Sequence, residues 1–322
     1  MKLKNLLVLA VPAFFWVACS SDTDGAPSEP SVVNEASSDS SGENLLPPTQ
    51  ESSSSSESLN SVDNPSNPLP ESSSSDEVAL SSEAAPSEPD VPFVPEELVY
   101  DSIGFVDIGN AFRTVAPDEK VVFVLRHAER EMETEKETPL TSDGVMQAQS
   151  VGQKLISADE FVFAHTDYVR TEETAHNIAL GRGQASFVHD TVAALTSGWF
   201  IKDAELRDSY IKKDTNTNVI VSLWAYDGMF ADAFYDLEKR SLEVINTYLI
   251  KDYAEMPRVK VVISHDEFLV PLVAWATNKT ATIYPRKRGH WWINYLAGLA
   301  IIVNSKNEIR YIGVKGLESA VK

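Results

Sequence analysis

From about residue 96 to residue 322, short apolar runs alternate with longer segments of mixed polarity. The runs are nearly continuous and rich in β-branched residues, which is typical of strands buried on both faces. They are KVVFVL (120–125), FVFA (161–164), RVKVVIS (258–264) and LAIIVN (299–304). Apolar residues near helical spacing predict helices at 143–157, 170–180 and 229–250. This alternation predicts an α/β fold, a three-layer α/β/α domain with a mostly parallel central sheet, over residues 96–322.

Residues 20–95 follow a different pattern and are dominated by serine, proline and acidic residues. This tract contains fifteen Asp and Glu residues and no Lys or Arg. Its apolar surface is too small to offset the backbone entropy that ordering would cost, so we expect a disordered acidic linker. Repulsion between its charges would keep the linker extended. A binding tail for a basic partner is the alternative interpretation.

Residues 1–19 begin with two lysines within the first four residues, continue with a short apolar run and end at Cys19. This layout is typical of a secretory signal peptide, and the run is shorter than the roughly twenty residues of a membrane span. It resembles a bacterial lipoprotein signal, although Trp16 departs from the usual pattern three positions before the cysteine. The resemblance implies an extracytoplasmic lipoprotein, anchored to a membrane through a lipid on Cys19, at the periplasmic face or the cell surface. An ordinary cleaved signal with an incidental thiol is the alternative.

Charge and residue usage narrow the classes of function. The chain has a formal net charge of −21, of which the linker supplies −15 and the N-terminal lysines +2, leaving −8 for the rest. No basic patch dominates, so we expect no nucleic-acid partner. His165, His176, His189 and His290 show no metal-ligand spacing, and the sequence predicts neither a metal site nor a cofactor. With one cysteine the chain forms no internal disulfide, so packing must stabilise the core.

Polar residues gather where two predicted strands end. Arg126 and His127 follow the run at 120–125, while His265 and Asp266 follow the run at 258–264. Ligands of parallel α/β sheets bind outside the carboxyl ends of the strands. If the two strands are parallel neighbours, both histidines lie at one edge of the sheet. Strand ends also carry polar residues simply because they emerge into water, but two histidine-centred clusters favour a functional site.

Four motifs in order along the chain resemble the histidine phosphatase superfamily, also called the phosphoglycerate-mutase-like superfamily. They are LRHAER (125–130), PLTSDGVMQAQSVGQKL (139–155), DYVRTEETA (167–175) and ISHD (263–266). Each motif is weak alone, whereas the ordered set covers most of the predicted domain. The family usually has glycine after its catalytic histidine, where this chain has Ala128.

The resemblance implies a phosphohistidine mechanism. His127 would be the nucleophile, splitting one difficult phosphoryl transfer into two easier steps. Arg126 and Arg170 would bind the phosphate, because planar guanidinium groups match phosphate oxygens in pairs. His265, if protonated, would add a further donor. The N-terminus of the helix that begins near Arg170 would favour the same anion.

The proton donor for the leaving group is open between two carboxylates. Asp266 follows His265 directly, as in the superfamily branch of acid phosphatases and phytases. Glu205 lies between the second arginine and the second histidine in chain order, where the mutase-like branch places its acid. Asp266 is favoured narrowly, because a strand end fixes its position.

Residues 191–228 break the periodicity and include the aromatic residues Trp199, Trp224 and Tyr226. They fit either a segment that covers the substrate or additional core packing. Together these features predict an extracytoplasmic phosphatase that acts on a small phosphorylated substrate without a metal. A phosphomutase of the same superfamily and a non-catalytic phosphate-binding surface lipoprotein are the alternatives.

Overall fold

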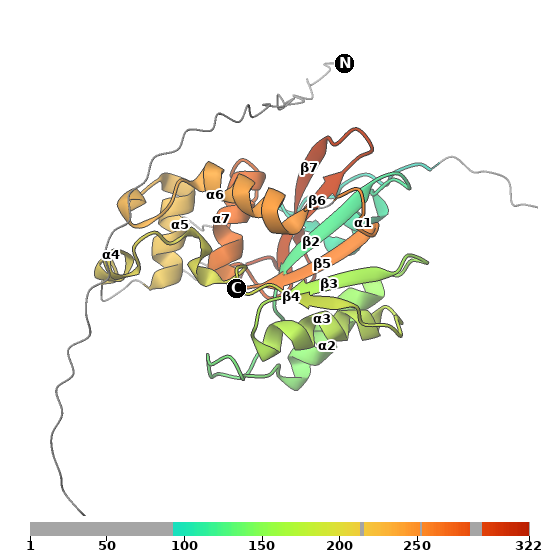
Figure 1. The fold of residues 1–322 in the computed structure, drawn as a ribbon, viewed down its shortest axis with the longest axis horizontal. Coiled ribbons are helices and arrows are strands. Elements are labelled where there is room, and N and C mark those ends of the chain that lie inside the picture. The colour runs from blue at the N-terminus through green and yellow to red at the C-terminus, as the bar shows by residue number, and fades with distance from the viewer. Residues whose placement is uncertain (1–92, 213–215, 252, 284–291, 322) are drawn as a thin grey trace, which may run out of the picture. The chain divides into compact units, whose positions relative to one another are not determined.

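The computed structural model describes residues 93–212, 216–251, 253–283 and 292–321 (Figure 1). The predicted signal peptide with Cys19, and the predicted linker as far as residue 92, lie outside the described residues. His290 and Trp291 also lie outside them. No helix among the described residues is long and apolar enough to span a membrane.

A seven-stranded sheet in the order β1-β7-β6-β2-β5-β3-β4 forms the centre of the fold. The strands are β1 (Val106–Asp107), β2 (Lys120–Arg126), β3 (Phe161–His165), β4 (His189–Thr191), β5 (Val259–Ser264), β6 (Ala297–Val303) and β7 (Ile309–Lys315). Neighbours β2 and β5, β5 and β3, β3 and β4, and β1 and β7 are parallel. Only β6 runs against its two neighbours, β2 and β7. The predicted mostly parallel sheet is confirmed.

Helices pack on both faces of this sheet (Figure 1). The α-helices are α1 (Ile108–Arg113), α2 (Ser142–Lys154), α3 (Val169–Gly181), α4 (Ala204–Ser209), α5 (Thr217–Asp227), α6 (Leu237–Val244) and α7 (Asp266–Ala276). The 3₁₀ turns are η1 (Ser197–Phe200) and η2 (Ala231–Ala233), and η3 (Ile245–Leu249) is a π-helical turn that continues α6.

Alternate side chains of β2 enter two different hydrophobic cores, which is why its sequence is continuously apolar. Phe123 and Leu125 pack with residues of α1, α2 and α3, whereas Val122 and Val124 pack with residues of α5, α6 and α7. All four side chains are completely buried. The prediction of three layers from uninterrupted apolar runs is therefore confirmed.

The predicted helix at 229–250 is wrong over its first part. Gly228 ends α5 with a φ of 72°, and Phe230 also has a left-handed φ of 58°. Helix α6 begins only after Asp236, whose side chain caps it by accepting a hydrogen bond from the backbone N–H of Lys239 at 2.8 Å. The apolar residues before Asp236 imitate helical spacing although only some of them enter the core: the ring of Phe234 is buried 4.3 Å from that of Trp224, whereas Met229 and Tyr235 are exposed.

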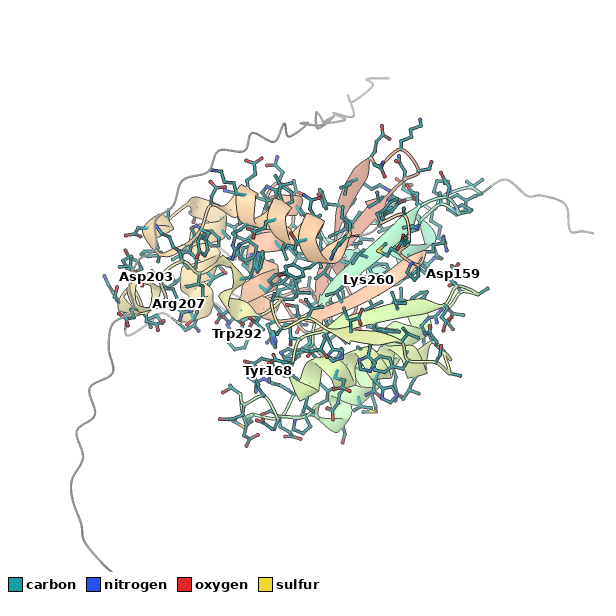
Figure 2. The ribbon with its side chains drawn as sticks, in the orientation of Figure 1. Asp159, Tyr168, Asp203, Arg207, Lys260 and Trp292 are labelled. Atoms are coloured by element: carbon teal, nitrogen blue, oxygen red, sulfur yellow. The ribbon has the colours of Figure 1, made fainter. Side chains whose placement is uncertain are left out.

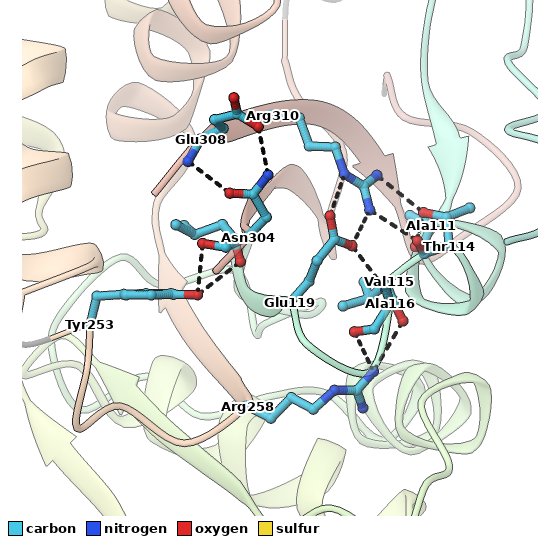
Figure 3. A network of polar contacts seen from close by, with 11 residues as sticks. Ala111, Thr114, Val115, Ala116, Glu119, Tyr253, Arg258, Asn304, Glu308 and Arg310 are labelled. Atoms are coloured by element: carbon cyan, nitrogen blue, oxygen red, sulfur yellow. Dashed lines mark hydrogen bonds and ion pairs between the residues drawn. The ribbon is translucent and has the colours of Figure 1, made fainter. Parts of the chain in front are cut away.

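The amino ends of the strands are held by a polar network (Figure 3). Arg310 forms an ion pair with Glu119 at 2.7 Å and donates to the backbone carbonyl of Thr114 at 2.9 Å. Arg258 donates to the carbonyls of Val115 and Ala116 at 3.0 and 3.3 Å. These contacts connect β2, β5 and β7 with the loop after α1, at the end of the sheet opposite the candidate site.

Candidate active site

The carboxyl ends of β2 and β5 bring the two predicted histidines together. The strands are parallel and pair Arg126 with Ser264, so the next residue of each chain segment, His127 and His265, leaves the sheet at the same edge. Their ring centroids lie 5.5 Å apart with an interplanar angle of 66°. Both side chains are at least 95 % buried, with exposures of 3 % and 4 %. The edge of a parallel sheet thus holds a buried pair of imidazoles.

One backbone carbonyl determines the protonation pattern of His127. Its Nδ1 lies 2.8 Å from the carbonyl oxygen of Ala128, and a carbonyl can only accept, so Nδ1 carries the proton. Burial, together with the charge of Arg126, holds the pKa of His127 well below its ordinary value. The ring is therefore neutral, and its Nε2 keeps a free lone pair.

The loop after His127 is held by α2 and α3, the helices that contain the second and third motifs. The backbone N–H of Ala128 donates to Thr174 Oγ1 at 2.9 Å, and this hydroxyl donates to the carbonyl of Arg170 at 2.6 Å. At Gly144 of α2, an added Cβ would lie 2.0 Å from the carbonyl oxygen of Glu129, so only glycine permits this approach. The structure accommodates Ala128 at the position where the family usually has glycine, and Thr174 is a positioning residue that sequence reasoning missed.

Arg126 and Arg170 are buried beside the histidines, with exposures of 2 % and 6 %. Arg126 donates from Nη1 to the carbonyl of Ile293 at 2.8 Å, and its guanidinium lies 4.4 Å from the ring of Tyr295. Arg170 donates from Nη1 to the carbonyl of Glu135 at 2.9 Å. The Nε–H groups of both arginines are buried and have no hydrogen-bond partner within the described residues. Buried donors in native proteins nearly always have a partner, so an oxyanion is the kind of group that fits here.

Aromatic rings complete the surroundings of the arginines. The guanidinium of Arg170 lies 4.3 Å from the ring of Tyr168, and that of Arg126 lies 5.4 Å from Trp292. These cation–π contacts hold each guanidinium while leaving donors unused. Tyr168 belongs to the motif at 167–175, which assigned it no role, and Trp292 lies outside the four motifs; both are labelled in Figure 2.

A chain of hydroxyl groups orders the protons around His265. The hydroxyl of Thr171 donates to the carbonyls of Thr166 and Tyr168 at 3.0 and 2.7 Å, so it accepts from Thr166 Oγ1 at 3.0 Å. Thr166 then accepts from Nε2 of His265 at 2.9 Å, which leaves the lone pair on Nδ1. Burial and the charge of Arg170 lower the pKa of His265 to about 4, so it is neutral at pH 7. A phosphate dianion would offset the charge of Arg170 and so favour a proton on Nδ1.

The two candidate proton donors occupy different environments. Asp266 lies in the cluster: its Oδ2 is 3.4 Å from Arg126 Nη2 and 3.3 Å from the amide nitrogen of Asn218, which donates to it. Its Oδ1 accepts from the backbone N–H of Glu267 at 2.9 Å. Glu205 is exposed on α4, which packs against α5 and lies at the outer end of the helical layer (Figure 1). Among the described residues, Glu205 has no contact with either histidine.

Glu267 is a largely buried carboxyl, with 19 % of its side chain exposed, that sequence reasoning missed. Burial, reinforced by the neighbouring charge of Asp266, raises the pKa of Glu267 to about 7. Its Oε2 lies 4.0 Å from Arg207 Nη1, which opposes the shift only in part. A sequence signal existed, since two acidic residues open an apolar helix, but burial of the second could not be inferred from spacing.

A cavity of about 350 Å³ opens beside His265. Its lining residues are Lys136, Asp167, Tyr168, Arg170, Ala193, Thr196, Ser197, Gly198 and His265. The start of the segment 191–228 therefore borders the cavity. Its large aromatic residues instead pack into the protein: Trp224 stacks on Phe234, and Tyr226 donates to the carbonyl of Ala281 at 2.7 Å.

Two buried histidines and two buried arginines lie together at the carboxyl edge of a parallel sheet, an arrangement in an α/β protein that is able to bind an anion. The sequence model of the histidine phosphatase superfamily (branch 1) matches residues 122–290, more than half of the chain. The chain therefore belongs to the histidine phosphatase superfamily.

Several solved structures are similar to this chain. Phosphoglycerate mutase from Bacillus anthracis strain Sterne has 16 % identity and a TM-score of 0.40, with 61 % of this chain and 92 % of that chain covered. Bacillus stearothermophilus YhfR has 17 % identity and a TM-score of 0.41, with 62 % and 98 % covered. A mycobacterial glucosyl-3-phosphoglycerate phosphatase has 15 % identity and a TM-score of 0.37, with 61 % and 95 % covered. A search of curated proteins found no match.

Proposed function

We propose that this protein hydrolyses a small phosphomonoester through a phosphohistidine on Nε2 of His127. The proposal rests on the hydrogen bond from His127 Nδ1 to the carbonyl of Ala128, which leaves Nε2 unprotonated in a buried ring. A neutral imidazole with a fixed tautomer is the form that can attack phosphorus. The unpartnered Nε–H groups of Arg126 and Arg170 support phosphate binding beside it.

The reaction proceeds in two displacements. In the first, the His127 Nε2–P bond forms and the bond from phosphorus to the leaving oxygen breaks, while that oxygen takes a proton. In the second, a water oxygen attacks phosphorus, the N–P bond breaks, and the proton from water returns to the acid that supplied the first. Arg126, Arg170 and protonated His265 would stabilise the charge on the equatorial oxygens.

Asp266 is the proposed proton donor. It touches Arg126 and follows His265 on the first turn of α7, whereas Glu205 lies on a separate helix. An acid in the same cluster as the nucleophile can reach the leaving oxygen without movement of a helix. We keep Glu205 as the competing donor in the tests below.

We further propose that the enzyme is extracytoplasmic and held to a membrane by a lipid on Cys19. Support comes from the N-terminal sequence pattern alone. Water is the only second substrate that hydrolysis requires, so this location suits a phosphatase better than a phosphomutase, which must keep its phosphohistidine from water. Release of free phosphate, rather than transfer to a second position on the substrate, distinguishes these activities.

The phosphoenzyme itself tests the proposal. The full chain is mixed with a radiolabelled phosphomonoester and quenched in alkaline detergent, and we expect a labelled protein that loses its label in acid. His127→Ala should lose label and lower turnover by about a thousandfold or more. His176→Ala, which removes an exposed histidine, is the matched control and should keep both. Full turnover in His127→Ala, or a label stable in acid, would overturn the mechanism.

A further inference from the structure

A second group of histidines lies on the neighbouring strands, outside the catalytic cluster. His165 is the last residue of β3, His189 is the first residue of β4, and Glu172 lies in the first turn of α3. One ligand atom from each of the three lies within 4.8 Å of the other two. Spacing along the sequence gave no indication of a metal site, because only the pairing of β3 with β4 beside α3 brings these residues together (Figure 1).

His165 is oriented as a metal-binding histidine is. Its ring is 2 % exposed, and its Nδ1 lies 2.8 Å from the carbonyl oxygen of Thr166, so Nδ1 carries the proton. The lone pair is therefore on Nε2, which points at Nδ1 of His189 at 2.8 Å. Histidine ligands of metals commonly donate their other N–H to a backbone carbonyl, which fixes the tautomer.

A simple hydrogen bond between the two histidines explains only part of this geometry. If Nδ1 of His189 donates to Nε2 of His165, both nitrogens are satisfied. This hydrogen bond does not explain the position of the Glu172 carboxylate. That carboxylate lies near both histidines but forms no ion pair or side-chain hydrogen bond within the described residues. Two imidazole nitrogens and one carboxylate are a donor set that zinc prefers.

We propose that His165, Glu172 and His189 bind one divalent ion of the zinc class, with a fourth position open to water. Zinc–nitrogen bonds of roughly 2.0–2.1 Å in tetrahedral geometry place two nitrogens about 3.3 Å apart. The gap of 2.8 Å between His165 and His189 must therefore open by about 0.5 Å. His189 and Glu172 are exposed, so they can turn toward an ion and give it a path from solvent.

The ion would add a cross-link between three elements, of which β3 and β4 already pair in the sheet and α3 already packs against β3. It would join the end of β3, the short edge strand β4 and the first turn of α3. That turn also carries Arg170, and Thr166, which follows His165, bonds to His265. The ion is thus a structural clamp that touches no substrate, and it stands whether or not the chain hydrolyses phosphomonoesters.

Zinc titration of the metal-free full chain tests the site. We expect one equivalent of Zn²⁺ to bind, and the melting temperature to rise by about 5 °C or more at a hundredfold excess over Kd. Co²⁺ should give the visible absorption of a four- or five-coordinate ion with nitrogen ligands. His189→Ala and Glu172→Gln each change an exposed ligand and should weaken binding by about tenfold or more. His176→Ala, on the same helix, should bind as the wild type does.

The same variants identify binding elsewhere. If the thiol of Cys19 binds the zinc, His189→Ala will still bind it. If His127 and His265 bind the zinc, His189→Ala will still bind it but His127→Ala will not. Either outcome overturns the proposal, as does a wild-type chain without saturable binding. Loss in His189→Ala and Glu172→Gln, with retention in His127→Ala and His176→Ala, establishes it.

Discussion

At the scale of single residues, hydrogen bonds to backbone carbonyls set the chemistry of the histidines. His127 and His165 each donate from Nδ1 to the carbonyl of the next residue in the sequence, Ala128 and Thr166 respectively. Each ring therefore keeps its lone pair on Nε2. The charges of Arg126 and Arg170 act on the ring of His127, whereas Nε2 of His165 faces another imidazole and lies near a carboxylate. The same local arrangement fits the proposed nucleophile at one strand end and the proposed metal ligand at the other.

Leaving-group dependence separates the two candidate proton donors. Asp266→Ala should slow hydrolysis of an alkyl phosphate by about a hundredfold or more, because an alkoxide leaves poorly without a proton. Nitrophenyl phosphate should be affected far less, since its phenolate barely needs one. Glu205→Ala, the matched change on the exposed helix α4, should leave both rates near wild type. Selective loss in Glu205→Ala, with equal slowing of both substrates in Asp266→Ala, would reassign the role to Glu205.

At the scale of elements, strand ends were predictable and the surroundings of the site were not. The apolar runs of β2 and β5 located His127 and His265, because a run buried on both faces ends where the sheet meets solvent. Thr166 and Thr174 escaped prediction, since a hydroxyl positions a catalytic group only through partners that are distant in sequence. For the same reason the sequence favoured Asp266 over Glu205 only narrowly.

The first turn of α7 makes stability depend on pH. The folded state raises the pKa of Glu267 to about 7, so it holds a proton that the unfolded chain releases near pH 4.5. Stability from this group therefore falls as pH rises from about 4.5 to 7. Glu267→Gln removes that loss, and we expect it to gain about 3 kcal/mol over the wild type at pH 8 but almost nothing at pH 4.

Urea unfolding at the two pH values measures this difference. Glu238→Gln, an exposed glutamate in the first turn of α6, is the control and should not show the gain. If the wild type and Glu267→Gln keep the same difference in free energy of unfolding at both pH values, Glu267 is not a buried acid.

At the scale of the whole molecule, composition predicts a division of the chain into an acidic linker and a folded domain. The sequence predicted the α/β class and the mostly parallel sheet because strand and helix periodicities alternate along the chain. It misplaced the start of α6, because core-filling residues around Phe234 have the same spacing as a helix face. The predicted anchor at Cys19 stays a prediction.

Membrane fractionation tests that anchor. In a bacterial host, the wild type should sediment with membranes, whereas Cys19→Ser should become soluble or remain unprocessed, because the serine cannot carry a thioether-linked lipid. Turnover by the purified proteins should be equal, since Cys19 lies far along the chain from the catalytic motifs. Correct processing of Cys19→Ser with undiminished membrane retention would exclude the lipid anchor.

The polar network of Arg310, Glu119 and Arg258 stabilises the amino ends of the strands, whereas the candidate site lies at their carboxyl ends (Figure 3). The seven residues of β2 separate that network from His127 by roughly 20 Å, at about 3.3 Å per residue. We therefore expect that substitutions among the charges of the network can alter stability while the candidate site at the carboxyl end of β2 keeps its geometry. Because β2 separates the two ends of the sheet, stability and the proposed chemistry can change independently during evolution.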